Sequence, residues 1–187
     1  MTEIEKILLK TAKQAIIEKF TGEHIINKET LYNQFPELKE KRATFVTLYM
    51  APDQDLRGCI GTLEPVRPLL EDVIHNARAA AFNDYRFDPL SPNELPDMLI
   101  EISLLSIPQK VEYNNIEELK NKIIPFQDGI VLQKDRARAT FLPQVWGQLS
   151  DFDLFFQHLC RKAGLPPDCL YEHPDIYKYT VKEIKDF

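Results

Sequence analysis

The sequence has few cysteines, and no spacing pattern joins them. Only Cys59, Cys160 and Cys169 occur in 187 residues, and none of them forms a C-x-x-C pair. A small, odd number of cysteines without that spacing disfavours a disulfide framework and a structural zinc site. The sequence therefore predicts three free thiols.

Long apolar runs and an excess of positive charge are also missing. No uncharged apolar stretch approaches the roughly 20 residues of a membrane-spanning helix, and the charged segment MTEIEKILLK lacks a signal-peptide core. The formal net charge is -6, whereas nucleic-acid-binding proteins carry a basic patch or stripe. We therefore expect a cytoplasmic protein with no membrane partner, and we rank nucleic acid below other partners.

Motifs for the common cofactors are absent as well. The sequence contains no Walker, Rossmann or H-E-x-x-H pattern, and its four histidines show no metal-ligand spacing. It thus predicts neither a cofactor nor a metal site.

Helical and strand patterns are intermixed along the chain. Helical periodicity extends to about residue 21, beginning at a Thr2–Glu5 capping box, and returns after Pro68. It recurs in SDFDLFFQHLCRKAGLP, where Ser150 or Asp151 opens the predicted helix and Gly164 closes it. Strand patterns cover residues 42–50, 56–63, 98–106, 128–135 and 139–142, and the ending YKYTVKEIKDF reads as one last strand. Several of these strands form predicted hairpins. The order favours an α+β fold, a mostly antiparallel sheet with flanking helices.

The stretch LRGCIGTLEP places a charge, a thiol and two glycines in one predicted strand. Because side chains alternate along a strand, Gly58 and Ile60 would share the core face with Leu56, and Arg57 would share the other face with Cys59 and Gly61. A nearby cation favours the thiolate, which is the reactive form of cysteine. The two glycines would let a ligand or another backbone come close, or would permit a bulge. The alternative is that Cys59 only fills space, as buried cysteines often do.

A catalytic thiol needs a base, and the surrounding sequence offers few candidates. His75, on the helix that follows the Cys59 strand, is the best of the four histidines, with a solvated surface histidine as the alternative. The segment NDYRF offers Asp84 and Arg86, or else a loop held by hydrogen bonds between these two residues. The segment FLPQVWGQ offers Gln144, or else a simple corner of the chain.

The stretch LRGCIG resembles the hallmark motif of the AMMECR domain family. The blocks NARAAAFNDYRFDPLSPNEL, IEISLLSIPQKV, DGIVL, FLPQV and LCRKAGLP follow in the order typical of that family. The likeness runs from Thr44 to the final strand and is greatest to the microbial form, AmmeMemoRadiSam system protein A. The sequence departs from the pattern at QKDRARA, where a glycine turn is expected, and at Cys169-Leu170, where a tryptophan is expected.

This resemblance implies a single domain over residues 1–187, with a larger and a smaller subdomain around a cleft. It also implies that Arg57, Gly58, Cys59, Ile60 and Gly61 lie at the presumed functional site of the family. The microbial name implies association with a Memo-type dioxygenase-like protein and a radical SAM protein. The family offers no settled activity to carry over.

Two functional hypotheses remain open at this point. In the first, the protein is a thiol-dependent enzyme in which Cys59 reacts, Arg57 orients an anionic substrate group, and His75 or Asp84 assists. In the second, it is a non-catalytic module that binds a small molecule, a partner protein or RNA. Both hypotheses place the substrate or ligand beside Gly58, Ile60, Gly61, Arg86 and Gln144.

Overall fold

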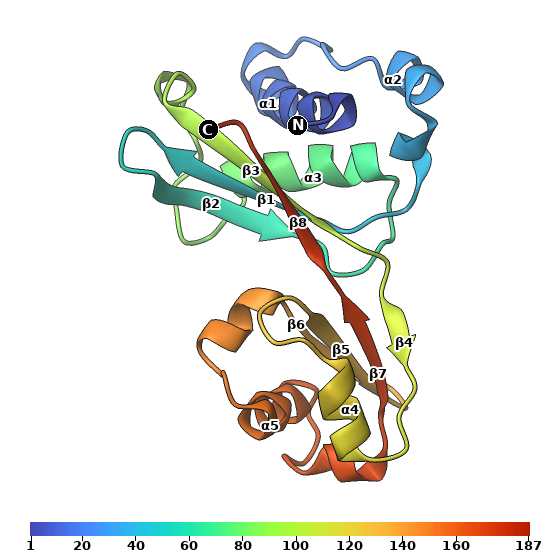
Figure 1. The fold of residues 1–187 in the computed structure, drawn as a ribbon. Helices are drawn as coiled ribbons and strands as arrows, with labels where there is room; N and C mark the ends of the chain where they lie inside the picture. The colour runs from blue at the N-terminus through green and yellow to red at the C-terminus, as the bar shows by residue number, and fades with distance from the viewer. The chain divides into compact units, whose positions relative to one another are not determined.

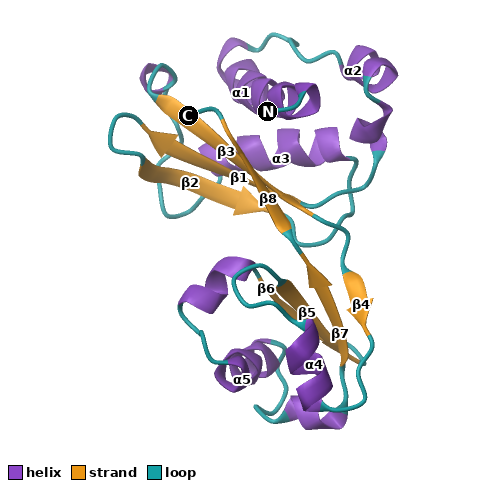
Figure 2. Cartoon of the chain, viewed as in Figure 1, coloured by secondary structure: helices purple, strands orange, loops and turns teal.

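The computed structural model describes all residues 1–187 and divides them into two compact units. The first unit comprises residues 1–105 and 182–187, and the second comprises residues 106–181. Both units combine helices with an antiparallel sheet (Figures 1 and 2), which confirms the predicted α+β class. None of the helices has the length and apolar character that crossing a membrane requires.

The first unit is a four-stranded sheet in the order β2-β1-β3-β8, with helices α1 and α3 packed on one face. Its helices are α1 (Glu3–Thr21), α2 (Lys28–Gln34) and α3 (Leu69–Phe82), with short 3-10 helices η1 (Pro36–Lys39) and η2 (Pro92–Glu94). Its strands are β1 (Thr44–Met50), β2 (Asp55–Gly61), β3 (Met98–Leu105) and β8 (Val181–Lys185). Helix α2 lies in a segment that the sequence pattern did not resolve.

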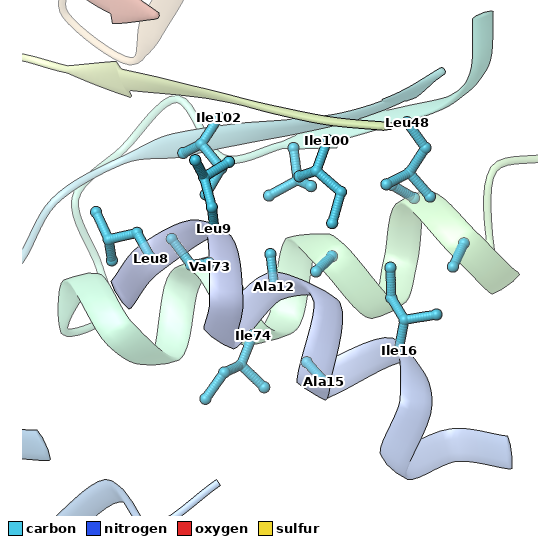
Figure 3. Close-up of a cluster of buried hydrophobic side chains, with 14 of the residues drawn as sticks. Leu8, Leu9, Ala12, Ala15, Ile16, Leu48, Val73, Ile74, Ile100 and Ile102 are labelled. Carbon is cyan, nitrogen blue, oxygen red and sulfur yellow. The ribbon is translucent and has the colours of Figure 1, made fainter. Parts of the chain in front are cut away.

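The core of this unit follows from the two periodicities in the sequence. Every third or fourth residue of α1 and every second residue of β1 and β3 is apolar, so these side chains meet between the helices and the sheet (Figure 3). Leu8, Ile16, Leu48, Ile100 and Ile102 are all fully buried. Each such side chain contributes roughly 1.5–3 kcal/mol through burial.

A buried polar network fixes the start of α3 against the sheet. The Asp72 carboxylate is inaccessible to solvent and accepts hydrogen bonds from the Thr44 amide at 2.9 Å and the Thr44 hydroxyl at 2.8 Å. Thr62 and Asn76 donate to the same carboxylate, and Arg67 forms an ion pair with it. With its oxygens fully engaged, this carboxylate has a structural role.

The second unit is a separate four-stranded sheet in the order β4-β7-β5-β6. Its core includes Trp146 and Phe155, whose ring centres lie 3.6 Å apart in a stacked arrangement. The unit also has two 3-10 helices, η3 (Pro143–Gly147) and η4 (Cys169–Glu172). Its helices α4 (Ile116–Lys122) and α5 (Phe152–Lys162) accompany strands β4 (Gln109–Val111), β5 (Gly129–Lys134), β6 (Ala137–Phe141) and β7 (Asp175–Tyr179).

Two expectations from the sequence are wrong here. Cys160 and Cys169 form a disulfide, with their Cα atoms 6.0 Å apart, and only Cys59 is free. The sequence did not predict this bond, because the two cysteines are nine residues apart and form no C-x-x-C motif. They come together only because the chain turns back after α5. The predicted last strand is in fact two strands, β7 and β8, which belong to different sheets and are divided at Thr180.

Candidate functional site

Strand β2 carries the LRGCIG segment at the edge of its sheet, and a bulge sets its register. Leu48 of β1 pairs with Gly58, whereas the next residue, Tyr49, pairs with Leu56, so Arg57 is the extra residue. The bulge turns Leu56 out of the core, leaving it 41% exposed, so its predicted place on the core face is wrong. Beyond the bulge, Gly58 faces the helices and Cys59 points to the opposite face.

The two glycines are required by close packing inside the fold. A Cβ atom on Gly58 would overlap the carbonyl oxygen of Ala80, because α3 lies directly against the backbone of β2. A Cβ atom on Gly61 would overlap the ring of Phe45 on the neighbouring strand. Of the roles predicted for these glycines, the structure shows close approach of another part of the chain at both positions and a bulge directly before Gly58.

The outward backbone groups of Cys59 are bound by the loop that follows α3. Asp84 accepts a hydrogen bond from the Cys59 amide at 2.9 Å, and Arg86 donates to the Cys59 carbonyl at 3.3 Å. Arg86 also forms a two-pronged pair with Asp84, at 2.9 and 2.7 Å. These bonds occupy the polar groups that an edge strand would otherwise leave unpaired.

The clamp formed by Arg86 removes Asp84 from acid–base chemistry near neutral pH. Hydrogen bonds from the Arg86 side chain, together with the Cys59 amide, hold the pKa of Asp84 well below its usual range, although burial opposes the shift. A carboxylate with so low a pKa is a poor proton acceptor. Asp84 therefore positions Cys59 through its backbone and is not suited to activate its thiol.

Arg57 is also engaged within the fold. Its Nε lies 2.6 Å from Glu94 of η2, its Nη2 donates to the Asp88 carbonyl at 3.0 Å, and its guanidinium lies 5.8 Å from the Phe87 ring centre. The hydrogen bond from Arg57 lowers the pKa of Glu94 to about 2. Because the negative charge of Glu94 neutralises the positive charge of the guanidinium, Arg57 does not present an unpaired positive charge beside the thiol.

The Cys59 thiol belongs to a line of polar side chains across the sheet, on the face opposite the helices. Thr47 pairs with Cys59 on one side and with Glu101 on the other, and its hydroxyl donates to the Cys59 sulfur at 3.2 Å. Lys185 of β8 completes the line through an ion pair of 2.9 Å with Glu101. We call Cys59, Thr47, Glu101 and Lys185 the Cys59 row.

Aromatic residues lie on either side of this row along β1. Tyr49 and Phe45 are each two residues from Thr47 and therefore share its face. Burial raises the pKa of Tyr49, and the negative charge of Glu101 adds to this effect. Hydrogen bonds to Glu101 and Glu183 raise the pKa of Lys185, so its ammonium stays charged. The row thus offers a thiol, a hydroxyl and a carboxylate–ammonium pair between two rings.

Comparison with known proteins places this arrangement in a family. The family model described as AMMECR1 matches residues 9–184. The chain belongs to the AMMECR1 family. It is similar to Protein MJ0810 of Methanocaldococcus jannaschii, with 37% identity over 90% of this chain and 84% of that protein. A protein of Thermococcus gammatolerans is 40% identical over 95% of this chain and 87% of its own length.

A solved structure supports the same assignment. The crystal structure of the uncharacterized protein PH0010 from Pyrococcus horikoshii matches this AMMECR1 chain with a TM-score of 0.74 and 37% identity, covering 98% of this chain and 91% of that one. The family assignment and the α+β architecture suggested by the LRGCIG motif are therefore confirmed.

The AMMECR1 fold brings together only some of the residues selected from the sequence. Arg57, Gly58, Ile60 and Gly61 adjoin Cys59 along β2, and Asp84 and Arg86 contact its backbone. His75 is exposed on α3, which packs on the sheet face opposite the thiol, and its side chain makes no hydrogen bond or ion pair. Gln144 is exposed on η3 of the second unit.

Sequence reasoning missed the other three members of the Cys59 row. One signal was available: Glu101 is a charged residue in the middle of the apolar strand MLIEISLL, and it is only 7% exposed. Thr47 and Lys185 gave no such signal, because only strand pairing places them beside Glu101. No group of three or more histidine, cysteine or acidic side chains comes together in a geometry suited to a metal ion.

Proposed function

We propose that this AMMECR1 chain is a non-catalytic binding module that holds a small polar molecule on the Cys59 row. The observation that carries the proposal is the alignment of Cys59, Thr47 and Glu101 at one level of three adjacent strands. Buried polar groups are normally paired: Thr47 is bonded to the Cys59 sulfur and Glu101 to Lys185, and the hydroxyl and carboxylate oxygens keep further acceptor capacity that a ligand can use. Glu101 and Thr47 are 7% and 6% exposed, in strands whose opposite face supplies the apolar core.

The chemistry of the row favours a ligand with both donor and acceptor groups. The Glu101 carboxylate accepts hydrogen bonds and the Lys185 ammonium donates them, while Tyr49 and Phe45 provide apolar surface on either side. Binding by itself needs no general base. This fits a site in which His75 lies on the other face of the sheet and Asp84 is clamped by Arg86.

The molecular setting of this module is part of the same proposal. The likeness to AmmeMemoRadiSam system protein A supports work with a Memo-type dioxygenase-like protein and a radical SAM protein. The bound molecule would then be a substrate, product or intermediate passed to or from those partners.

A second candidate function is a thiol-dependent reaction at Cys59. It is favoured by one contact, the hydrogen bond that Thr47 donates to the half-buried sulfur. A hydroxyl donor at this position would stabilise the thiolate, which is the nucleophilic form of cysteine. This candidate lacks a base within hydrogen-bonding distance of the thiol.

Native mass spectrometry would test the binding proposal. The full-length protein is incubated with a low-molecular-weight fraction of a cell extract and compared with Glu101→Gln, Cys59→Ser and, as a charge-matched control at an exposed position outside the row, Glu37→Gln. We expect a bound species that the wild type and Cys59→Ser retain and Glu101→Gln loses. Absence of any bound species, or equal retention by Glu101→Gln, would refute the proposal.

Alkylation of the native protein separates the two candidates. If Cys59 only contributes to binding, iodoacetamide should label it slowly at pH 7 and the bound species should not become covalent. Rapid labelling at pH 7, or a covalent adduct on Cys59 that Cys59→Ser lacks, would instead support thiol chemistry.

A further inference from the structure

We infer that the second unit contains a binding site for a compact organic cation, meaning an ammonium group on an aromatic or branched alkyl body. The site is a cavity of about 320 Å³ bounded by α4, α5 and η4. This volume lies at the lower end of the range for small-molecule pockets. It involves none of the residues of the Cys59 row, so the inference is independent of the proposed function.

The floor of the cavity is apolar. Ile116 of α4, Phe156 of α5 and Leu170 of η4 supply it. Phe156 and Leu170 are 1% and 5% exposed and belong to the core of the unit, which fixes their positions. A floor of this kind favours the apolar body of a ligand at roughly 25 cal/mol per Å² of buried surface.

The rim of the cavity carries negative charge without a matching positive charge. Asp153, in the first turn of α5, and Asp168, which precedes η4, both line the cavity and are both exposed. Neither carboxylate forms an ion pair or a side-chain hydrogen bond. No lysine, arginine or histidine lines the cavity, and Lys120 of α4 lies over the Phe152 ring instead. The rim therefore favours a cation and disfavours an anion.

An exposed aromatic ring stands at the same rim. Tyr171 of η4 is 73% exposed, which is high for so large a side chain. The face of an aromatic ring attracts an ammonium group within about 6 Å. Two carboxylates and one ring thus line the exposed part of the cavity, above an apolar floor.

The two walls of the cavity are held in place by covalent structure. The disulfide joins Cys160 of α5, the helix that carries Asp153 and Phe156, to Cys169 of η4, the segment that carries Leu170 and Tyr171. Both cysteines are buried, at 0% and 1% exposure. A pocket with fixed walls loses little conformational entropy on binding, which favours affinity for a small ligand.

Three probes of similar size test the charge preference. Phenethylammonium, 2-phenylethanol and phenylacetate share one aromatic body and differ in charge, and each is titrated into the full-length oxidised protein by 1H–15N correlation NMR. We expect phenethylammonium to shift the amides of α5 and η4 and to bind at least about fivefold more tightly than the neutral alcohol, as one or two exposed charge contacts provide. Phenylacetate should bind more weakly still.

Matched variants locate the site. Asp153→Asn and Asp168→Asn should each weaken phenethylammonium binding by roughly threefold and the double variant by roughly tenfold. Asp135→Asn, at the turn between β5 and β6 outside the cavity, should leave it unchanged. Because all three are exposed isosteric changes, unaltered spectra elsewhere will show that the fold is intact.

Several results would overturn the inference. One is equal binding of the alcohol and the ammonium; another is binding that survives the double variant. A third is no binding of phenethylammonium up to about 10 mM, which corresponds to an interaction weaker than about 3 kcal/mol. Binding of a lysine-rich peptide in the absence of phenethylammonium binding would overturn it as well and would assign the cavity to a protein partner.

Discussion

Replacing Gly58 with alanine tests whether the hallmark glycine serves packing or ligand access. The new Cβ would overlap the Ala80 carbonyl oxygen and lie 3.1 Å from the Ala80 carbonyl carbon. The obstacle is helix backbone, so no side-chain rotation relieves it. Overpacking typically costs about 1–3 kcal/mol, and the lower entropy of unfolded alanine returns about 0.4–1 kcal/mol. We expect Gly58→Ala to lower the free energy of unfolding by about 1–2 kcal/mol.

The protein provides an internal control for this measurement. Trp146, the single tryptophan, is fully buried in the second unit, so its fluorescence reports unfolding there, whereas Gly58 lies in the first unit. In urea, Gly58→Ala should shift hydrogen exchange of α1 and α3 to lower denaturant and leave the Trp146 transition in place. Gly147→Ala, where a Cβ would meet nothing within 4 Å, should change stability by less than about 0.5 kcal/mol.

A double-mutant cycle at Gly61 sharpens the same test. Here the obstacle is the Phe45 ring, which can be removed. Gly61→Ala should be destabilising in the wild type and nearly neutral in a Phe45→Ala background, with a coupling of about 1–3 kcal/mol. If Gly58→Ala and Gly61→Ala leave stability unchanged but abolish ligand binding, the packing explanation is refuted and the glycines serve the ligand.

Three further predictions concern other parts of the chain. The hydrogen bond from Arg57 lowers the pKa of Glu94 from 4.5 to about 2. The ionised carboxylate therefore stabilises the fold above pH 4.5, and this stabilisation is lost as the pH falls towards 2. Measured by urea unfolding, Glu94→Gln should lower the free energy of unfolding by on the order of 2 kcal/mol at pH 7 and by little at pH 2. Reduction of the Cys160–Cys169 disulfide, which closes a short loop, should lower the stability of the second unit by about 2.5 kcal/mol, read from Trp146 fluorescence; no change would contradict its structural role. Asp72→Ala should cost about 3 kcal/mol, because it leaves several buried donors unpaired, and calorimetric stability equal to wild type would refute that network's importance.

The sequence determined much of the local structure and the family. The capping box at Thr2 and Glu5 starts α1, and Gly22 ends it in a left-handed conformation, because these effects act over a few residues. Alternation in TFVTLYM and MLIEISLL placed Leu48, Ile100 and their neighbours on the core face of the sheet for the same reason. The LRGCIG motif identified the family before any geometry was known.

The tertiary structure decided which residues accompany Cys59. The bulge at Arg57 reverses the side of Leu56, and a one-residue change of register is invisible to composition. Strand order sets Thr47 and Glu101 beside the thiol and puts α3, with His75, on the other face. The bonds from Arg57 to Glu94 and from the Cys59 amide to Asp84 depend on a loop that folds back over the edge of β2. Long-range contacts of this kind join residues 25 to 37 positions apart, so only the folded chain could reveal them.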